Sequence, residues 1–148
     1  MAQVLIDSNV LVYTFDQNEP RKQEQAVRVL GQLSASGNGL LSVQCLAEFA
    51  SVSLRRLRPP LSAAEAADHI ERFAQTFHIL NLTAPIVIEA ARGVRDHKLS
   101  YYDAQLWATA RLNQIPTLFS EDFASNTSLA GVRFVNPFAE DFDLAAWV

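Results

Sequence analysis

The sequence predicts an α/β fold in a single domain, with a central, mostly parallel sheet flanked by helices. Strand and helix patterns alternate along the chain, which is typical of a parallel sheet whose strands are connected by helices. The 148 residues fit one compact domain. The composition, 49% hydrophobic and 19% charged, is that of a globular protein and excludes disordered and collagen-like classes.

The first half of the chain predicts two strands and three helical segments. Residues 3–6 form a short buried strand, and a brief helical turn follows at residues 9–13. Residues 21–33 repeat apolar side chains along one helical face, and residues 39–41 form the second strand. Ser42 can cap the next helix, which must end before the two consecutive prolines at positions 59 and 60.

The second half continues the alternation. Ser62 and Glu65 have the spacing of a capping box, which predicts a helix through residue 75. The remaining predicted elements are a strand at 78–82, a helix from 84 to about 96 with a proline in its first turn, a helix at 100–113, a strand at 117–119 and an edge strand at 131–135. The sheet thus has four to five strands, and we expect the apolar end, residues 144–148, to pack onto the domain or a partner.

Four acidic residues lie at positions where a carboxylate is costly without compensation. Asp7 and Asp122 follow the predicted strands 3–6 and 117–119, Glu48 interrupts an apolar helix, and Asp103 lies in the first turn of a largely apolar helix. A shared divalent cation would compensate all four. Because the histidines and Cys45 lack zinc-ligand spacing, an oxygen-only site favours Mg²⁺ or Mn²⁺.

Each acid also has a simpler interpretation. Asp7 is suited to cap the helical turn that follows it, and Asn9 can hydrogen-bond Asp7 or favour a turn in its own right. Asp103 lies three residues after Ser100, which is the spacing of a capping box. Beside Asp122, Glu121 can take the same role. These alternatives remain open from the sequence.

Glu48 carries the strongest signal, because its helical neighbours are apolar and unpaired glutamates are seldom buried. The alternative to a metal is an ion pair with a nearby arginine such as Arg55 or Arg56, about two turns further along the helix. Ser42 and Gln44 precede Glu48, where they can supply a cap and a supporting hydrogen bond.

The charge balance restricts the partners. A formal net charge of -4 argues against broad nonspecific affinity for nucleic acid, which depends on Lys and Arg. The densest basic group, Arg55, Arg56 and Arg58, suits either a helix C-terminus or a substrate contact. No apolar run approaches the ~20 residues of a membrane helix, and the single cysteine allows no internal disulfide, so we expect a cytoplasmic protein without a membrane segment.

Four segments together resemble the PIN-domain ribonucleases, and within them the VapC-type toxins of type II toxin-antitoxin systems. They are LIDSNVL at 5–11, LSVQCLAEF at 41–49, LSYYDA at 99–104 and LFSEDF at 118–123. The resemblance implies that Asp7, Glu48, Asp103 and Asp122 bind the metal and are catalytic. It gives Asn9 and Ser120 supporting roles. We also expect Ser42 to support the site through its helix cap, and Glu121 to support it or to compete with Asp122 for the fourth position.

The resemblance further implies a PIN-like domain over residues 1–148 that hydrolyses RNA phosphodiester bonds with Mg²⁺ or Mn²⁺. It implies a homodimer and a cognate antitoxin. The basic group of Arg55, Arg56 and Arg58 is the candidate contact to RNA or antitoxin. Two alternatives are a catalytically inactive PIN-like module that binds RNA or protein, and a phosphatase of the haloacid-dehalogenase type. The phosphatase needs a second Asp two residues after Asp7, where this chain has Asn9.

Overall fold

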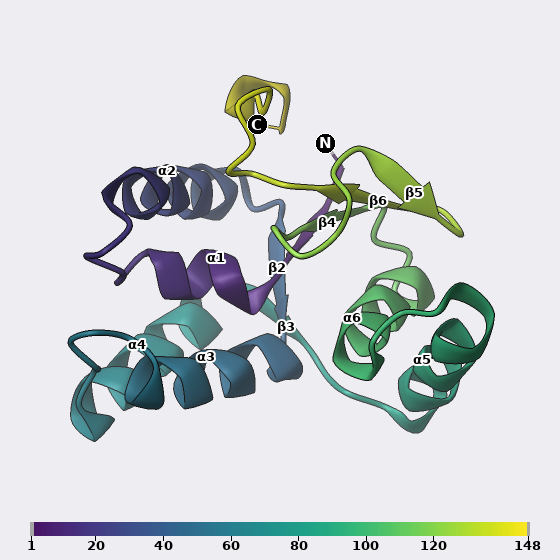
Figure 1. Ribbon diagram of the computed structural model, residues 1–148, viewed down its shortest axis with the longest axis horizontal. Coiled ribbons are helices and arrows are strands. Elements are labelled where there is room, and N and C mark those ends of the chain that lie inside the picture. Colours follow the sequence, from purple (N-terminus) through teal and green to yellow (C-terminus); the bar gives the residue numbers. More distant parts are fainter. Residues whose placement is uncertain (1, 148) are drawn as a thin grey trace.

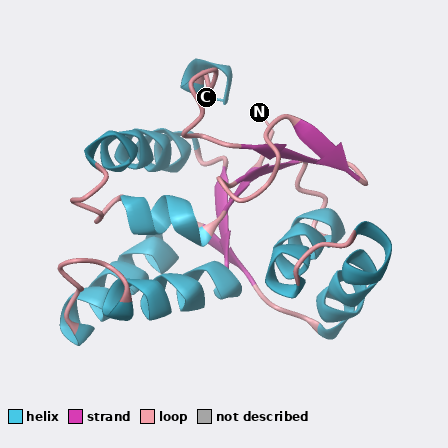
Figure 2. Ribbon diagram, viewed as in Figure 1, coloured by secondary structure: helices cyan, strands magenta, loops and turns pink. Residues whose placement is uncertain are grey.

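A six-stranded sheet forms the centre of the molecule, seen in the computed structural model that describes residues 2–147 (Figures 1 and 2). The strands are β1 (Val4–Ile6), β2 (Gly39–Ser42), β3 (His78–Leu80), β4 (Thr117–Phe119), β5 (Thr127–Leu129) and β6 (Val132–Val135). Their order across the sheet is β3-β2-β1-β4-β6-β5. All neighbouring pairs are parallel except β5 and β6, which are antiparallel. The predicted α/β fold is confirmed.

Helices cover both faces of the sheet (Figure 1). They are α1 (Ser8–Tyr13), α2 (Pro20–Ser36), α3 (Val43–Arg55), α4 (Ala63–Thr76), α5 (Ala84–His97) and α6 (Tyr101–Leu112), followed by a short 3-10 helix, η1 (Leu144–Trp147). Alternating residues of β1 point to opposite faces, as a strand requires. Leu5 joins the core beneath α5 and α6, whereas Val4 and Ile6 join the core beneath α1, α2 and α3.

The sheet is larger than the predicted four to five strands. β5 was missed because its three residues are exposed or half-buried and show no apolar alternation. The strand predicted at the edge, β6, instead lies between β4 and β5. Ala130 and Gly131 connect β5 to β6 with φ angles of 48° and 86°, the left-handed conformations of a tight hairpin turn.

The helix caps confirm two predictions and contradict one alternative interpretation. The Ser42 hydroxyl accepts a hydrogen bond from the backbone N–H of Cys45, which is buried, and Ser62 and Glu65 form the predicted capping box. Ser100 is the N-cap of α6, but its side chain makes no capping hydrogen bond. The capping-box alternative for Ser100 and Asp103 is therefore contradicted, although Asp103 still lies in the first turn of α6, where an acidic side chain suits the helix dipole.

The end of the chain folds back onto the domain, as one of the two alternatives predicted. Leu144 and Trp147 pack against the core beneath α1, α2 and α3, and the Trp147 ring meets Phe119 of β4 edge-on at 5.2 Å between centroids. Val148 lies outside the described residues. Within residues 2–147, every helix is too short or too polar to span a bilayer.

Gly93 allows α5 and α6 to approach closely, and its replacement provides a stability prediction. A Cβ atom at Gly93 would lie 2.8 Å from Cζ3 of the buried Trp107. We expect Gly93→Val to destabilise the protein by about 1–3 kcal/mol, the typical cost of overpacking a core. Gly31→Val in α2 is the matched control, because nothing lies within 4 Å of its Cβ position. Urea denaturation of both variants measures the difference, and equal stability would contradict this packing.

Candidate active site

The parallel strands bring distant acidic residues to one edge of the sheet. Ile6 of β1 is paired with Phe119 of β4, so Asp7 and Ser120, the residues that follow, leave the sheet side by side. The backbone N–H of Asp7 donates to the carbonyl of Phe119 at 2.9 Å. α3, which carries Glu48, begins at the same edge directly after β2. The carboxyl ends of parallel strands are where α/β proteins build ligand sites.

The four predicted acids are close enough to repel one another. Asp122 and Glu48 both disfavour ionisation of Asp7, and Asp103 and Asp122 do the same to Glu48. Asp103 also raises the pKa of Asp122. The four acids therefore lie near enough to influence one another's ionisation.

Asp7 is the innermost acid, with only 4% of its surface exposed. It accepts hydrogen bonds from the Ser8 backbone N–H at 2.6 Å and from the Ser120 hydroxyl at 2.7 Å. Within residues 2–147, no Lys, Arg or His forms an ion pair with it. Burial therefore raises the pKa of Asp7 to about 7, with smaller contributions from Asp122 and Glu48, despite these two hydrogen bonds.

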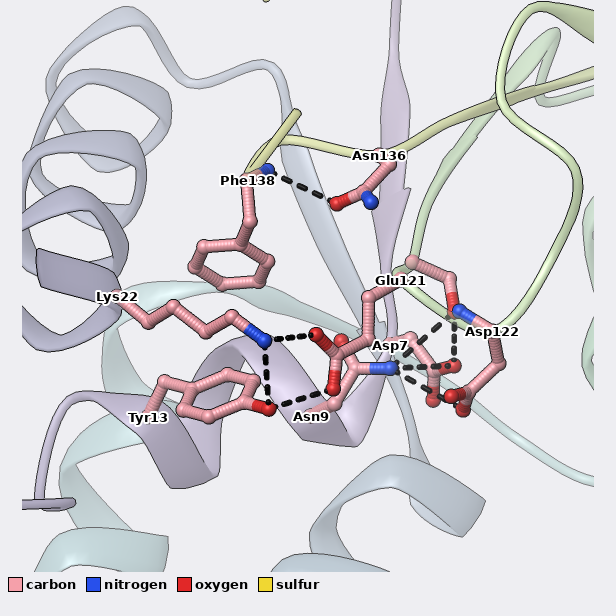
Figure 3. Close-up of polar contacts among 9 residues, drawn as sticks. Asp7, Asn9, Tyr13, Lys22, Glu121, Asp122, Asn136 and Phe138 are labelled. Carbon is pink, nitrogen blue, oxygen red and sulfur yellow. Dashed lines mark hydrogen bonds and ion pairs between the residues drawn. The ribbon is translucent and has the colours of Figure 1, made fainter. Parts of the chain in front are cut away.

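Asn9 holds two of the acids together (Figure 3). Its side-chain amide donates to Asp7 Oδ2 at 3.4 Å and Asp122 Oδ2 at 3.2 Å, and it also lies 3.2 Å from the Ser120 hydroxyl oxygen. The Ser120 oxygen accepts from the backbone N–H of Asp122 at 3.0 Å. Burial nevertheless keeps the pKa of Asp122 raised, and the buried Asn9 Oδ1 has no hydrogen-bond partner among the described residues.

Glu48 is half-buried, and burial is the main cause of its raised pKa. Gln44 Nε2 donates to Glu48 Oε1 at 3.2 Å, and Gln105 Nε2 donates to Gln44 Oε1 at 3.0 Å. This hydrogen bond from Gln44 to Glu48 is the one expected from the position of Gln44 one turn before Glu48. Gln105 was missed, although a glutamine in the apolar run from Ala104 to Ala110 was a usable signal.

Neither arginine considered as an ion-pair partner for Glu48 takes that role among the described residues. No salt bridge joins Glu48 to any basic side chain in residues 2–147. Arg55 donates to Ser51 Oγ at 2.8 Å, and Arg58 donates to the carbonyls of Arg55 and Leu57 at the end of α3. Arg58 thus fulfils the helix-terminus interpretation of this basic group.

Glu121 is compensated separately from the other acids. The Tyr13 hydroxyl donates to Glu121 Oε1 at 2.6 Å, and Lys22 Nζ forms an ion pair with Oε2 at 3.0 Å (Figure 3). The hydrogen bond from Lys22 Nζ to Glu121 is the main cause of the raised pKa of Lys22. Tyr13 and Lys22 were missed, because about a hundred residues separate them from Glu121 and nothing local links them.

The donor set of the site suits a hard divalent cation. Its groups are carboxylate, hydroxyl and amide oxygens, which Mg²⁺ and Mn²⁺ prefer. In the part of the chain described, no three His, Cys, Asp or Glu side chains are close enough to form a ready-made metal site. The uncompensated Asp7 and the unpartnered Asn9 Oδ1 both lack the positive or polar partner that a hydrated cation would provide. The residues therefore fit such an ion, and the metal site stays a prediction.

Comparison with known proteins gives a family and a fold. Residues 4–125 match the model of the PIN domain. No curated protein matches the chain. Among solved structures, a toxin-antitoxin complex from Klebsiella pneumoniae is 20% identical with a TM-score of 0.67, covering 91% of this chain and 98% of that chain.

Two further structures share the fold. VapC20 of Mycobacterium tuberculosis, described as a sarcin-ricin loop cleaving toxin, is 18% identical with a TM-score of 0.59, covering 81% of this chain and 92% of that chain. DNA-bound VapBC from Salmonella typhimurium is 15% identical with a TM-score of 0.62, covering 90% and 97%. The resemblance to PIN domains seen in the sequence is confirmed, and this chain belongs to the PIN domain family.

Proposed function

We propose that the protein is a metal-dependent endoribonuclease that hydrolyses RNA phosphodiester bonds, and that it is the VapC-type toxin of a toxin-antitoxin pair. The observation that carries the proposal is the buried, unpaired Asp7, which shares the Asn9 amide with Asp122 and whose ionisation both Asp122 and Glu48 disfavour. Such an arrangement is unfavourable unless a cation compensates it. The PIN domain match and the toxin structures with the same fold support the proposal.

In this proposal Asp7, Glu48, Asp103 and Asp122 hold Mg²⁺ or Mn²⁺. A bound divalent cation would activate water for attack on the phosphodiester and stabilise the charge that develops on the phosphate. Ser120 orients the Asp7 carboxylate, and Asn9 keeps Asp122 beside it. We assign the fourth position to Asp122 rather than Glu121, because Tyr13 and Lys22 already satisfy Glu121.

The substrate and the protein partners that we propose are suggested by the solved structures that share this fold. The similar structures include a toxin-antitoxin complex and a toxin described as cleaving the sarcin-ricin loop. We therefore propose RNA as substrate, a cognate antitoxin as inhibitor, and a cytoplasmic homodimer as the working form. Arg55 and Arg56, which are exposed at the end of α3, would contact RNA or antitoxin, with Arg58 beside them.

Two other functions are distinguishable from this one. A catalytically inactive PIN-like module would bind RNA or protein without metal-dependent cleavage, and the presence of all four acids disfavours it. A phosphatase of the haloacid-dehalogenase type is disfavoured by Asn9, because the amide cannot replace the second aspartate that such an enzyme needs.

Expression in a bacterial host tests the proposal. Wild type is compared with Glu48→Gln, which removes one acid of the site, and with Glu71→Gln on the exposed surface of α4 as the matched control. We expect wild type and Glu71→Gln to arrest growth and to create discrete new RNA 5′ ends, whereas Glu48→Gln does neither. The purified wild type should cleave RNA with Mg²⁺ or Mn²⁺ and stop when EDTA is added. Wild-type RNA binding without cleavage would favour the inactive module.

A further inference from the structure

Two glutamines connect the helices that carry Glu48 and Asp103. Gln105 of α6 donates from Nε2 to Gln44 Oε1 at 3.0 Å, and Gln44 of α3 donates from Nε2 to Glu48 Oε1 at 3.2 Å. The Gln44 amide also donates to the backbone carbonyl of Tyr102, in the first turn of α6, at 3.0 Å. Gln44 therefore contacts both Glu48 and the residue next to Asp103.

Gln105 determines which way the Gln44 amide faces. A carboxamide has one oxygen that accepts and one nitrogen that donates two hydrogen bonds. Because Gln105 Nε2 occupies the Gln44 oxygen, the two N–H groups of Gln44 are directed at Glu48 and at the Tyr102 carbonyl. If Gln44 were reversed, its oxygen would face the Glu48 carboxylate and the Tyr102 carbonyl, and all three groups are acceptors.

Gln105 is a polar side chain buried in an apolar core, so its presence there costs free energy unless its amide is hydrogen-bonded. Its side chain is 5% exposed, and its neighbours Ala104, Leu106 and Trp107 belong to the core beneath α5 and α6. A buried amide costs free energy unless it is hydrogen-bonded, and an apolar residue at this position would avoid that cost.

The two helices are otherwise packed against different partners. α6 packs mainly on α5, whereas α3 packs on α1 and α4 (Figure 1). The charges of Glu48 and Asp103 repel each other, which drives the two side chains apart. The glutamine pair is thus a direct polar connection between the two helices at the level of their acids.

We propose that Gln44 and Gln105 form a clamp that holds Glu48 at a fixed position relative to Asp103, so that both can bind one divalent cation. The clamp rests on the proposed function, because it gives these two residues a positioning role for the proposed metal site. Gln105 acts only through Gln44, and Gln44 acts on Glu48 and the first turn of α6.

Calorimetric Mn²⁺ titration of four variants of the full chain tests the clamp. They are Gln44→Met, Gln105→Met, the double variant, and Thr109→Val as the matched control, which removes another buried hydrogen bond one turn along α6. We expect Gln44→Met and Gln105→Met each to weaken Mn²⁺ binding by about 10- to 100-fold, the usual loss when a partner of a metal-ligating carboxylate is removed. Thr109→Val should bind Mn²⁺ like wild type.

The double variant separates a clamp from independent structural effects. If Gln105 acts through Gln44, the double variant should bind Mn²⁺ no more weakly than Gln44→Met alone, since the connection is already broken. Wild-type affinity in Gln105→Met, multiplying effects in the double variant, or an equal loss in Thr109→Val would each overturn the proposal.

A second measurement distinguishes failure of the clamp from failure of the nuclease proposal. If the wild type binds no Mn²⁺, the proposed metal site is wrong, and the clamp is then judged in metal-free protein by NMR. The side-chain amide signals of Gln44 should move in both Gln105→Met and Glu48→Gln, but not in Thr109→Val. Unmoved Gln44 signals in Gln105→Met would overturn the clamp in that case as well.

Discussion

Replacement of Asp7 by asparagine is expected to reduce RNA cleavage by about 100-fold or more while leaving the fold intact. Removal of one group that stabilises charge in a reaction typically costs this much. Asn is nearly isosteric with Asp and retains one oxygen that can accept the Ser8 N–H. It cannot supply the negative charge with which Asp7 would hold a divalent cation beside Glu48 and Asp122.

Single-turnover cleavage of RNA by the purified protein measures this effect, and circular dichroism reports the fold. Asp68→Asn is the control, because Asp68 is an exposed residue of α4. That variant should cleave like wild type. Undiminished cleavage by Asp7→Asn would remove Asp7 from the reaction and leave its buried position unexplained.

The second large effect concerns stability, which Asp7→Asn is expected to increase at neutral pH. The pKa of Asp7 is about 7 in the folded protein and 3.8 in the unfolded reference, so the folded state binds the proton more tightly. Its contribution to stability is fully present below pH 3.8 and is lost as the pH rises to about 7 and above. At about 1.4 kcal/mol per tenfold change in proton affinity, the loss is of the order of 4 kcal/mol.

Urea denaturation between pH 4 and pH 8 tests this prediction. Relative to Asp7→Asn, wild type should lose stability across this range, and Mn²⁺ should restore it at pH 8 in wild type only. Glu48 and Asp122 also have raised pKa values and are present in both proteins, so the difference between the two profiles reports Asp7 together with its repulsion from these two acids. Parallel pH profiles would mean that Asp7 is ionised without strain in the folded protein.

Strands and helices that carry an apolar pattern or a capping residue in their own sequence were predictable. The apolar strands and the helices with clear caps, such as that begun by Ser62, lie close to their predicted positions. β5 was not predictable, because its pairing with β6 depends on a turn with two left-handed residues rather than on apolar alternation. Ser100 and Asp103 have the spacing of a capping box without its hydrogen bond, which shows that spacing alone does not decide a cap.

The acids of the candidate site were predictable where a carboxylate lies in an otherwise apolar segment of the sequence. A carboxylate in an apolar helix or after a buried strand must be compensated, and this argument selected Glu48 and Asp7 without coordinates. Contacts across long sequence distances were not predictable. The pairing of Lys22 with Glu121, and the connection from Gln105 to Gln44, depend on how distant segments pack in space.

The position of β1 between β2 and β4 determines which parts of the site can adjust. Asp7 is attached to this innermost strand, and its own N–H is bonded to β4, so it cannot move without disrupting the middle of the sheet. Asp122 lies on a loop, and Glu48 and Asp103 lie on α3 and α6 outside the sheet. Asp7 is thus the acid of the site that is anchored directly to the centre of the sheet, and the other three are held by elements that pack around it.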